Sequence, residues 1–196
     1  MDVRHDVALD MARLYRTLSP EGIEQLTSIL VPMRFNKGDI ILKEGEVAHF
    51  IYWVHKGFLR QFYYKNKKDL TEHLSFEGGM VQCIESFYKQ EPTILQIEAM
   101  ENSIVYGVPY DKIEKLSEES TELGIFYRKI LEHSLILSQI KANMLRFESA
   151  QSRYRIMKKL QPEAMRRAPL NMIASFLQMT PETLSRVRAK ELELND

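Results

Sequence analysis

Residues 173–190, IASFLQMTPETLSRVRAK, space their apolar side chains in a way that one helix cannot place on a single face. The successive steps are four, two, five and three for Ile173, Leu177, Met179, Leu184 and Val187. Two helices joined by a tight turn near residues 177–179 can bury all five, with Ala174 where the helices cross. Thr180 is then the N-cap of the second helix and Pro181 its first residue. The stretch therefore predicts a helix-turn-helix.

The second helix of this pair has a polar and basic outer face. Arginine can donate two hydrogen bonds to guanine and a carboxylate can accept one from cytosine, so Arg186 and Glu182, one turn apart, are candidates for reading neighbouring base pairs. An ion pair between these two side chains on a solvated face is the alternative, and the two readings are compatible. Flanking residues are candidates for contacts with phosphates, which position a domain without reading sequence. The candidate DNA-binding residues are Thr180, Pro181, Glu182, Thr183, Ser185, Arg186, Lys190, Arg153 and Arg167.

Charge is distributed unevenly along a chain whose formal net charge is zero. Residues 151–190 contain nine basic and two acidic residues, whereas the last six residues and residues 1–150 are both net acidic. A basic segment beside an acidic body is typical of nucleic-acid binding, although solvated basic helices also occur in proteins that bind none.

A long segment before the basic end predicts one helix with two apolar faces. One face follows alternating steps of four and three, a heptad seam that favours a parallel homodimer, through Phe126, Ile130, His133, Leu137, Ile140, Met144 and Phe147. A histidine in such a seam is more often packed or hydrated than a ligand or a switch. The second face is expected to cover the rest of the domain with Leu131, Leu135, Ala142 and Leu145. The alternative is that both faces pack inside one subunit.

Short segments rich in β-branched and aromatic residues fill residues 33–109, and turn sequences such as NKGD, EGE, KNKKD and EGG separate them. Many short strands at such spacing predict a β-roll or barrel. Before them, residues 6–31 have helical spacing, with Ser19 and Pro20 placed as an N-cap and first helical residue. Two short helices are therefore expected at the start of the chain.

Composition excludes several classes of protein. Hydrophobic residues make up 44% of 196 residues, yet no apolar run approaches the roughly 18 residues that cross a bilayer. The first residues lack the pattern of a signal peptide, so we expect a cytoplasmic protein with no membrane partner. The single cysteine, Cys83, excludes an intrachain disulfide and a cysteine cluster for iron–sulfur or structural zinc. No catalytic constellation, metal-ligand spacing or phosphate-binding glycine loop is present, which argues against an enzyme.

From about Leu18 to Lys190 the chain resembles the Crp/Fnr family, the bacterial regulators related to the cyclic-AMP receptor protein. The resemblance rests on FNKGDIILKEGE (35–46), IYWVHKGFLR (51–60), the long helix and IASFLQMTPETLSRVRAK. It implies a homodimer on a palindromic operator, base reading by Glu182 and Arg186, and a phosphate contact by Thr183. Two features depart from the family. Gln178 stands where a glycine is usual, at a cost of about 1 kcal/mol if its backbone is left-handed, and the β wing is absent or reduced.

The ligand site departs further from the family's cyclic-nucleotide binders. In FEGGMVQCIESFYKQEPTILQIEA (76–99), Gln82 and Cys83 fall where the family has glycine and glutamate for the ribose, and Thr93 and Ile94 where it has arginine and serine for the phosphate. A buried phosphate without a cation is penalised by desolvation, so neither cyclic AMP nor cyclic GMP is expected. Phe87 and Tyr88 suit another small molecule or fill the cavity. Ser138 and Gln139 of the long helix complete this degenerate pocket, although both also suit a packed helix.

Cys83 has two readings. In the first, it is a reactive thiol, or a haem ligand with His73 as its partner, and takes part in sensing. In the second, it is a small buried hydrophobic residue that only packs, which is the more common role of a buried cysteine. We expect no cofactor.

Together these features predict an α+β chain. Residues 1–149 form an N-terminal jelly-roll sensor with flanking helices and a long dimerisation helix over about 117–149, and residues 150–196 form a helix-turn-helix domain. We expect a homodimeric, sequence-specific transcription regulator whose partners are double-stranded DNA and, as further candidates, RNA polymerase and a small-molecule effector. The alternative is a β-roll sensor or interaction module without sequence-specific DNA binding.

Overall fold

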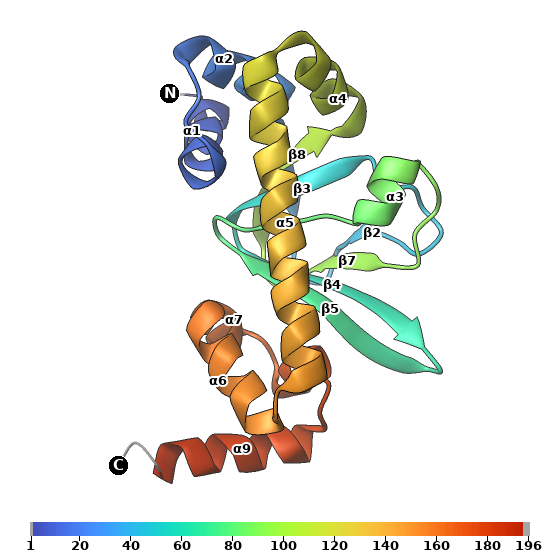
Figure 1. Ribbon diagram of the computed structural model, residues 1–196. Helices are drawn as coiled ribbons and strands as arrows, with labels where there is room; N and C mark the ends of the chain where they lie inside the picture. The colour runs from blue at the N-terminus through green and yellow to red at the C-terminus, as the bar shows by residue number, and fades with distance from the viewer. Residues whose placement is uncertain (1, 194–196) are drawn as a thin grey trace.

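The computed structural model describes the backbone of residues 2–193 and the side chains of residues 2–191 (Figure 1). Its strands are β1 (Val31–Phe35), β2 (Ile40–Leu42), β3 (Phe50–Lys56), β4 (Phe58–Lys65), β5 (Lys68–Phe76), β6 (Met80–Val81), β7 (Gln96–Ala99) and β8 (Ser103–Pro109). Its helices are α1 (Val3–Tyr15), α2 (Pro20–Ile29), α3 (Ile84–Lys89), α4 (Tyr110–Glu119), α5 (Thr121–Phe147), α6 (Ala150–Leu160), α7 (Pro162–Arg167), α8 (Leu170–Phe176) and α9 (Pro181–Glu193). The predicted α+β class is confirmed.

The strands form a β-roll of two four-stranded antiparallel sheets. Their orders are β1-β8-β3-β6 and β2-β7-β4-β5, so strands distant in the sequence pair within each sheet. Four successive residues of β3, Ile51–Val54, and the five residues at the start of β4, Phe58–Phe62, are buried. Such continuous burial shows that both faces of these central strands are covered, because a strand with one solvated face would alternate.

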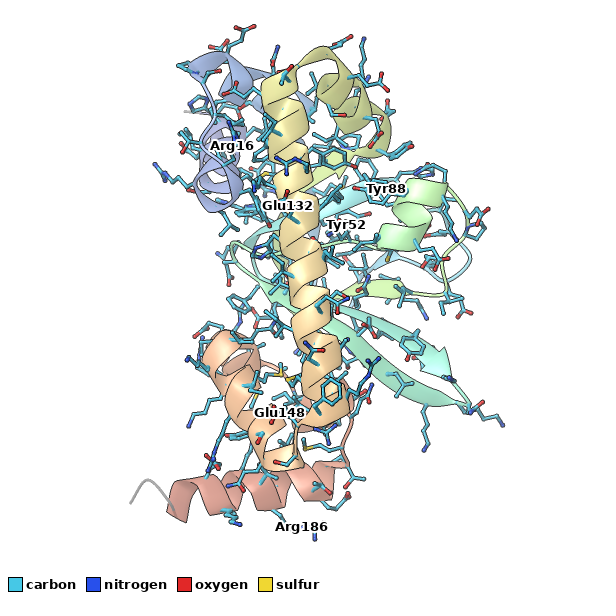
Figure 2. The ribbon with its side chains drawn as sticks, viewed as in Figure 1. Arg16, Tyr52, Tyr88, Glu132, Glu148 and Arg186 are labelled. Atoms are coloured by element: carbon cyan, nitrogen blue, oxygen red, sulfur yellow. The ribbon has the colours of Figure 1, made fainter. Side chains whose placement is uncertain are left out.

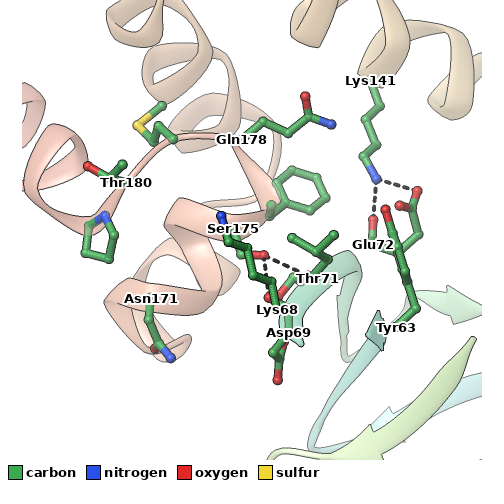
Figure 3. A pocket seen from close by; sticks show the side chains of 14 residues that line it. Tyr63, Lys68, Asp69, Thr71, Glu72, Lys141, Asn171, Ser175, Gln178 and Thr180 are labelled. Carbon is green, nitrogen blue, oxygen red and sulfur yellow. Dashed lines mark hydrogen bonds and ion pairs between the residues drawn. The ribbon is translucent and has the colours of Figure 1, made fainter. Parts of the chain in front are cut away.

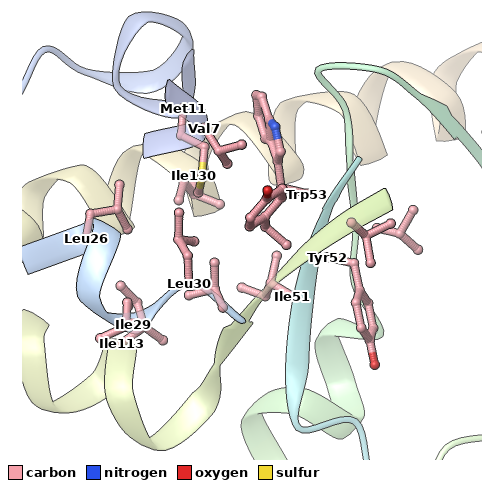
Figure 4. Packing of buried hydrophobic residues seen from close by; sticks show 14 of the residues in the cluster. Val7, Met11, Leu26, Ile29, Leu30, Ile51, Tyr52, Trp53, Ile113 and Ile130 are labelled. Carbon is pink, nitrogen blue, oxygen red and sulfur yellow. The ribbon is translucent and has the colours of Figure 1, made fainter. Parts of the chain in front are cut away.

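Helices α1 and α2 pack with α5 over one side of the roll (Figure 4). Ser19 caps α2 by accepting a 3.1 Å hydrogen bond from the Gly22 amide, as its place before Pro20 predicts. The Glu122 carboxylate, in the first turn of α5, accepts from the amide and the hydroxyl of Ser19 at 2.8 and 2.7 Å. The N-terminal helices are thereby fixed to the start of α5.

The long helix is shorter than predicted and its apolar faces serve different ends. Ser120 separates α4 from α5 and caps α5 through the Leu123 amide. Phe126 and Ile130 are 0% and 3% exposed in the core shared with α1, α2 and the roll, and Met144 is 5% exposed in a second core. The assignment of these three residues to a dimer seam is wrong, because the chain itself covers them.

The second half of α5 exposes apolar side chains. Ile136, Leu137, Ile140 and Phe147 are 59%, 41%, 39% and 72% exposed, and Leu135 of the predicted second stripe is 62% exposed. Leu131 and Leu145 of that stripe do pack against the two cores, whereas Ala142 is exposed. His133 is exposed and its ring meets that of Tyr15 edge to face, with centroids 5.4 Å apart.

A second hydrophobic core joins the C-terminal helices to the roll. Its buried members come from β4, β5, α5 and the helices α6 to α9: Phe58, Leu74, Met144, Tyr154, Met157, Ala164, Ile173, Ala174, Phe176, Leu177 and Leu184. The C-terminal helices therefore dock on sheet β2-β7-β4-β5, and α8 covers its β5 edge.

Within residues 2–193, no helix combines the length and apolar character that crossing a membrane requires.

Candidate nucleic-acid interface and sensor pocket

Helices α8 and α9 form the predicted helix-turn-helix. Ile173, Ala174, Leu177 and Leu184 are fully buried between them. The turn is closed by the Gln178 amide donating to the Ser175 carbonyl and the Met179 amide to the Ala174 carbonyl, each at 3.0 Å.

The turn adopts a left-handed backbone at Gln178, where φ is +51°. An L-residue pays about 1–2 kcal/mol for this conformation, whereas glycine does not. The side chain of Gln178 is exposed. The sequence predicted a cost at Gln178 if its backbone were left-handed, and the backbone is left-handed there.

Helix α9 begins as its sequence predicts. The Thr180 hydroxyl accepts a 3.2 Å hydrogen bond from the Thr183 amide, which is the contact of an N-cap, and Pro181 follows at the first helical position. A bond from Thr180 and the nearby charge of Arg186 hold the pKa of the Glu182 carboxyl below its ordinary value. Glu182 is therefore ionised at neutral pH and can accept hydrogen bonds.

The outer face of α9 is open to solvent. Glu182, Ser185, Arg186 and Lys190 are exposed, and Figure 2 shows Arg186 pointing away from the body of the protein. Arg186 donates to the Thr183 hydroxyl at 3.5 Å, and no Glu182–Arg186 ion pair forms among the described side chains. The guanidinium is held by one weak contact and can exchange it for a base edge.

Three arginines near α9 are less free than their sequence suggests. Arg153 is half-buried, and its Nε is buried without a hydrogen-bond partner among the described residues. The guanidinium of Arg188 lies 3.5 Å from the Met165 carbonyl. Arg155 is exposed but paired with Glu191 at 2.8 Å. On α9 itself, the exposed basic side chains are Arg186 and Lys190.

Arg167 is placed differently from its prediction as a phosphate contact. Its side chain is only 12% exposed and forms ion pairs with Glu77 at 2.6 Å and Glu101 at 2.7 Å, both in turns of the roll. A guanidinium with two carboxylate partners has little capacity left for a phosphate. In this structure Arg167 joins the C-terminal helices to the roll, and the assignment to the DNA-binding surface is corrected.

Part of the predicted ligand pocket does converge. Cys83 and Thr93 are 1% and 7% exposed, and Gln61 of β4 donates to the Cys83 sulfur and to the Gln82 carbonyl, each at 3.0 Å. The Gln82 Nε2 donates to the Ser134 hydroxyl of α5 at 2.5 Å. The other amide atom, Gln82 Oε1, is buried without a partner among the described residues.

Other predicted members of the pocket lie elsewhere. Ile94 is 67% exposed, and Ser138 and Gln139 lie on the exposed part of α5. Ser134, one helical turn before Ser138, is the α5 residue that reaches the pocket, and sequence reasoning missed both it and Gln61. Phe87 is fully buried. Burial raises the pKa of Tyr88 to about 12, and the Tyr88 hydroxyl donates a hydrogen bond to the Tyr127 hydroxyl at 2.6 Å.

The surroundings of Cys83 and His73 favour the uncharged forms of both side chains. Burial raises the pKa of the Cys83 thiol, although hydrogen bonds with Gln61 and Thr93 oppose that rise. Burial and the nearby charge of Lys141 lower the pKa of His73 to about 4, so its ring is neutral at pH 7. Among the described residues, no group of three or more His, Cys, Asp or Glu side chains is placed to hold a metal ion.

A cleft of about 640 Å³ separates the β4–β5 hairpin from the helix-turn-helix (Figure 3). Its walls include Tyr63, Lys68, Phe176, Gln178 and Thr180. Lys141 of α5 donates to the Glu72 side chain and carbonyl, each at 2.5 Å, and its ammonium lies 5.0 Å from the centre of the Phe176 ring. Beside them, the Thr71 amide donates to the Ser175 hydroxyl at 2.9 Å. These contacts fix α8 against β5.

Comparisons with known proteins agree with this architecture. Residues 32–120 match the family model of the cyclic nucleotide-binding domain. The chain is similar to the solved structure of FixK2 from Bradyrhizobium japonicum, with a TM-score of 0.69 and 17% identity over 85% of this chain and 86% of that one. It is also similar to the catabolite activator protein of Thermus thermophilus, with a TM-score of 0.57 and 18% identity over 93% and 87% of the two chains.

A third similar structure is the c-di-GMP-responsive global regulator CLP of Xanthomonas campestris, with a TM-score of 0.63 and 17% identity over 88% of this chain and 91% of that one. No curated protein sequence matches the chain. At these identities the likeness concerns the fold, and it extends over the roll, the long helix and the C-terminal helices together.

Proposed function

We propose that this protein is a sequence-specific DNA-binding transcription regulator of the Crp/Fnr type, with residues 1–149 as its sensor and residues 150–196 as its reader. The observation that carries the proposal is the outer face of α9, where Glu182 and Arg186 are exposed while the helix is anchored beneath by Leu184. Base edges in the major groove are read by such pairs. Thr180, Thr183 and Lys190 are suited to phosphates.

A parallel homodimer would place two α9 helices on one operator. The exposed apolar residues of α5 support it, because Ile136, Ile140 and Phe147 fall on one line with His133 and Asn143 at alternating steps of three and four. This seam is rotated by roughly 50° about the helix from the one read in the sequence, taking about 100° per residue. Leu137 flanks it.

The proposed signal enters at the hydrogen-bonded cluster of Gln61, Gln82, Cys83, Thr93 and Ser134, which we call the Gln82 pocket. A cyclic nucleotide would need a cation there, and the buried arginine of the roll, Arg60, is already bound by Asp69 and Glu98. The unpartnered Gln82 Oε1 instead favours an effector that donates a hydrogen bond. RNA polymerase remains a candidate partner of the DNA-bound dimer.

A gel-shift titration on genomic fragments selected by the parent protein tests the assignment of the reader. Arg186→Ala should weaken specific binding by about 1–3 kcal/mol and relax the preference for one base pair. Arg13→Ala is the matched control, because Arg13 is 75% exposed on α1, remote from α9. Equal affinity of the Arg186→Ala variant and the parent would refute base reading by Arg186.

The salt dependence of binding separates this function from its alternative, a sensor or interaction module. Contacts with several phosphates make the logarithm of the affinity fall steeply with the logarithm of the salt concentration, by about 0.9 for each phosphate. A flat dependence, with no fragment preferred over another, would favour the module without specific DNA binding.

A further inference from the structure

Three turns of the roll converge at one end to form an acidic cradle. Glu77 follows β5, Glu101 lies between β7 and β8, and Gly57 lies between β3 and β4. The Gly57 amide donates to Glu77 Oε1 at 2.7 Å, which orients that carboxylate. The cradle is therefore built from turns that connect strands of the two sheets, and the Gly57 bond fixes one of its two carboxylates.

Arg167 fills the cradle with an almost complete set of bonds. Its Nε and Nη2 donate to the two oxygens of Glu101 at 3.0 and 2.7 Å, and its Nη1 donates to Glu77 at 2.6 Å. The guanidinium carbon lies 5.2 Å from the centre of the Phe58 ring, a cation–π contact on the floor of the cradle. Forked bonding of this kind requires arginine, since lysine offers no planar fork.

The ionisation of the three groups agrees with their geometry. Bonds from Arg167 and Gly57 lower the pKa of Glu77 to about 2, and the bond from Arg167 lowers the pKa of Glu101. The two carboxylates in turn raise the pKa of Arg167. All three groups are charged over the whole neutral range, so the contact persists under ordinary conditions.

In the sequence, the residues of the cradle adjoin both the segment that contains Gln82 and the helix-turn-helix. On the sensor side, Glu77 is followed by two glycines and by β6, after which come Gln82 and Cys83. On the reader side, Arg167 ends α7, and Pro169 two residues later is the N-cap of α8. A movement of the β5–β6 turn therefore acts directly on the residue that positions α8 and, through the tight turn, α9.

We propose that the clamp of Arg167 with Glu77 and Glu101 positions the reading helix on the sensor roll and passes the state of the Gln82 pocket to it. Its regulatory meaning rests on the function proposed above, whereas the docking itself can be tested without DNA. Arg167 is in this view a positioning residue.

Hydrogen exchange on the full chain, followed by mass spectrometry, tests the docking. Arg167→Gln should accelerate exchange in α8 and at the Thr71 amide of β5 on the order of tenfold, the size of a lost charged hydrogen bond. Arg166→Gln is the matched control, since Arg166 is its neighbour, is 70% exposed, and forms its ion pair among the described side chains with the nearby Glu163. Exchange in the Arg167→Gln variant equal to that of the parent would overturn the proposal.

If Arg167→Gln accelerates exchange throughout the roll, the variant has destabilised the whole domain and a milder variant is needed. Glu101→Gln is that variant, because it leaves Arg167 held by Glu77. Local acceleration in α8 then supports the clamp, and no change refutes it. Arg167→Lys should fall between the parent and Arg167→Gln, because it retains the charge without the fork.

Transmission is tested by a double-mutant cycle. Gln82→Ala removes the bond to Ser134 and should alter exchange in α8 of the parent, but not in the Arg167→Gln background. Additive effects, or no effect in α8 of the parent, would refute transmission through the clamp.

The last test measures how the affinity of Arg167→Gln for DNA depends on salt. A positioning role predicts weaker binding by Arg167→Gln with an unchanged salt slope, whereas a phosphate contact predicts a slope lower by about 0.9. The latter result would overturn the positioning role. Absence of specific binding by the parent itself would refute the proposed function and its regulation, while exchange would still report whether the reader docks through Arg167.

Discussion

Replacement of Gln178 by glycine should stabilise the helix-turn-helix. The backbone at this position has a φ of +51°, which costs an L-residue about 1–2 kcal/mol. Glycine removes that cost but loses about 0.5–1 kcal/mol more conformational entropy on folding. The exposed side chain of Gln178 contributes little packing. We therefore expect a net gain of about 0.5–1 kcal/mol.

Thermal unfolding followed by far-ultraviolet circular dichroism can measure this gain. For a chain of this size 1 kcal/mol corresponds to about 2–4 °C, so Tm should rise by about 1–4 °C. Fluorescence of the single tryptophan, Trp53, is a less suitable probe because it reports on β3 of the roll.

Gln178→Ala is the control for the loss of the glutamine amide. Alanine keeps a Cβ atom and therefore the left-handed strain, so it should not raise Tm. The reasoning is refuted if the alanine variant is as stable as the glycine variant, since the gain would then come from the side chain and not from the backbone.

Two further predictions concern Ile140 of α5 and His73 of β5. Ile140→Lys should raise the dissociation constant of the proposed dimer about 100-fold in sedimentation experiments, because each of the two copies loses about 1.5 kcal/mol of burial. Leu135→Lys is the control, because Leu135 lies off the seam on the same helix, and it should leave the dissociation constant unchanged. Equal effects of the two substitutions would argue against the seam. The folded-state pKa of His73 is about 4, below its ordinary 6.5, so its contribution to stability is complete above pH 6.5 and is lost as the pH falls toward 4. His73→Gln should remove up to about 3 kcal/mol of that pH dependence in urea unfolding, and an unchanged pH profile would refute it.

Local rules were sufficient for the helix-turn-helix and for the start of several helices. The caps at Ser19 and Thr180 and the burial of Leu184 follow from short-range chemistry, which the sequence contains in full. The strands of the roll were located by β-branched and aromatic segments with turn residues between them. Their order in two sheets is a matter of long-range pairing, and only the family resemblance pointed to it.

The seam of α5 could not be predicted correctly because the first half of the helix is covered by other helices, whereas the second half is exposed. Alternating steps of four and three from Phe126 to Phe147 are consistent with more than one face, and the choice depends on which neighbours cover the first half. Helices α1 and α2 cover Phe126 and Ile130, so the exposed seam begins only near Ile136. No property of residues 126–147 alone contains that information.

Arg167 was assigned to the wrong partner, and Ser134 was missed, for a related reason. A basic residue in a basic segment is assigned to nucleic acid by composition, yet the partners of Arg167 are 66 and 90 residues away in the sequence. Ser134 and Ser138 differ by one helical turn, and which of them meets Gln82 depends on the rotation of α5 against the roll. Charge density and spacing do not report such distant contacts.

The three tasks assigned to α5 constrain how a signal can act. Ser134 accepts the hydrogen bond from Gln82, and Ile136 begins the exposed apolar seam two residues later. Met144 packs in the second core about 15 Å from Ser134 along the helix, at 1.5 Å per residue. A helix without glycine or proline after Gly124 transmits rotation along its length. An effector that takes the Gln82 amide from Ser134 therefore cannot leave the seam undisturbed. Pocket variants such as Gln82→Ala should change dimer affinity even when their own contacts lie outside the interface.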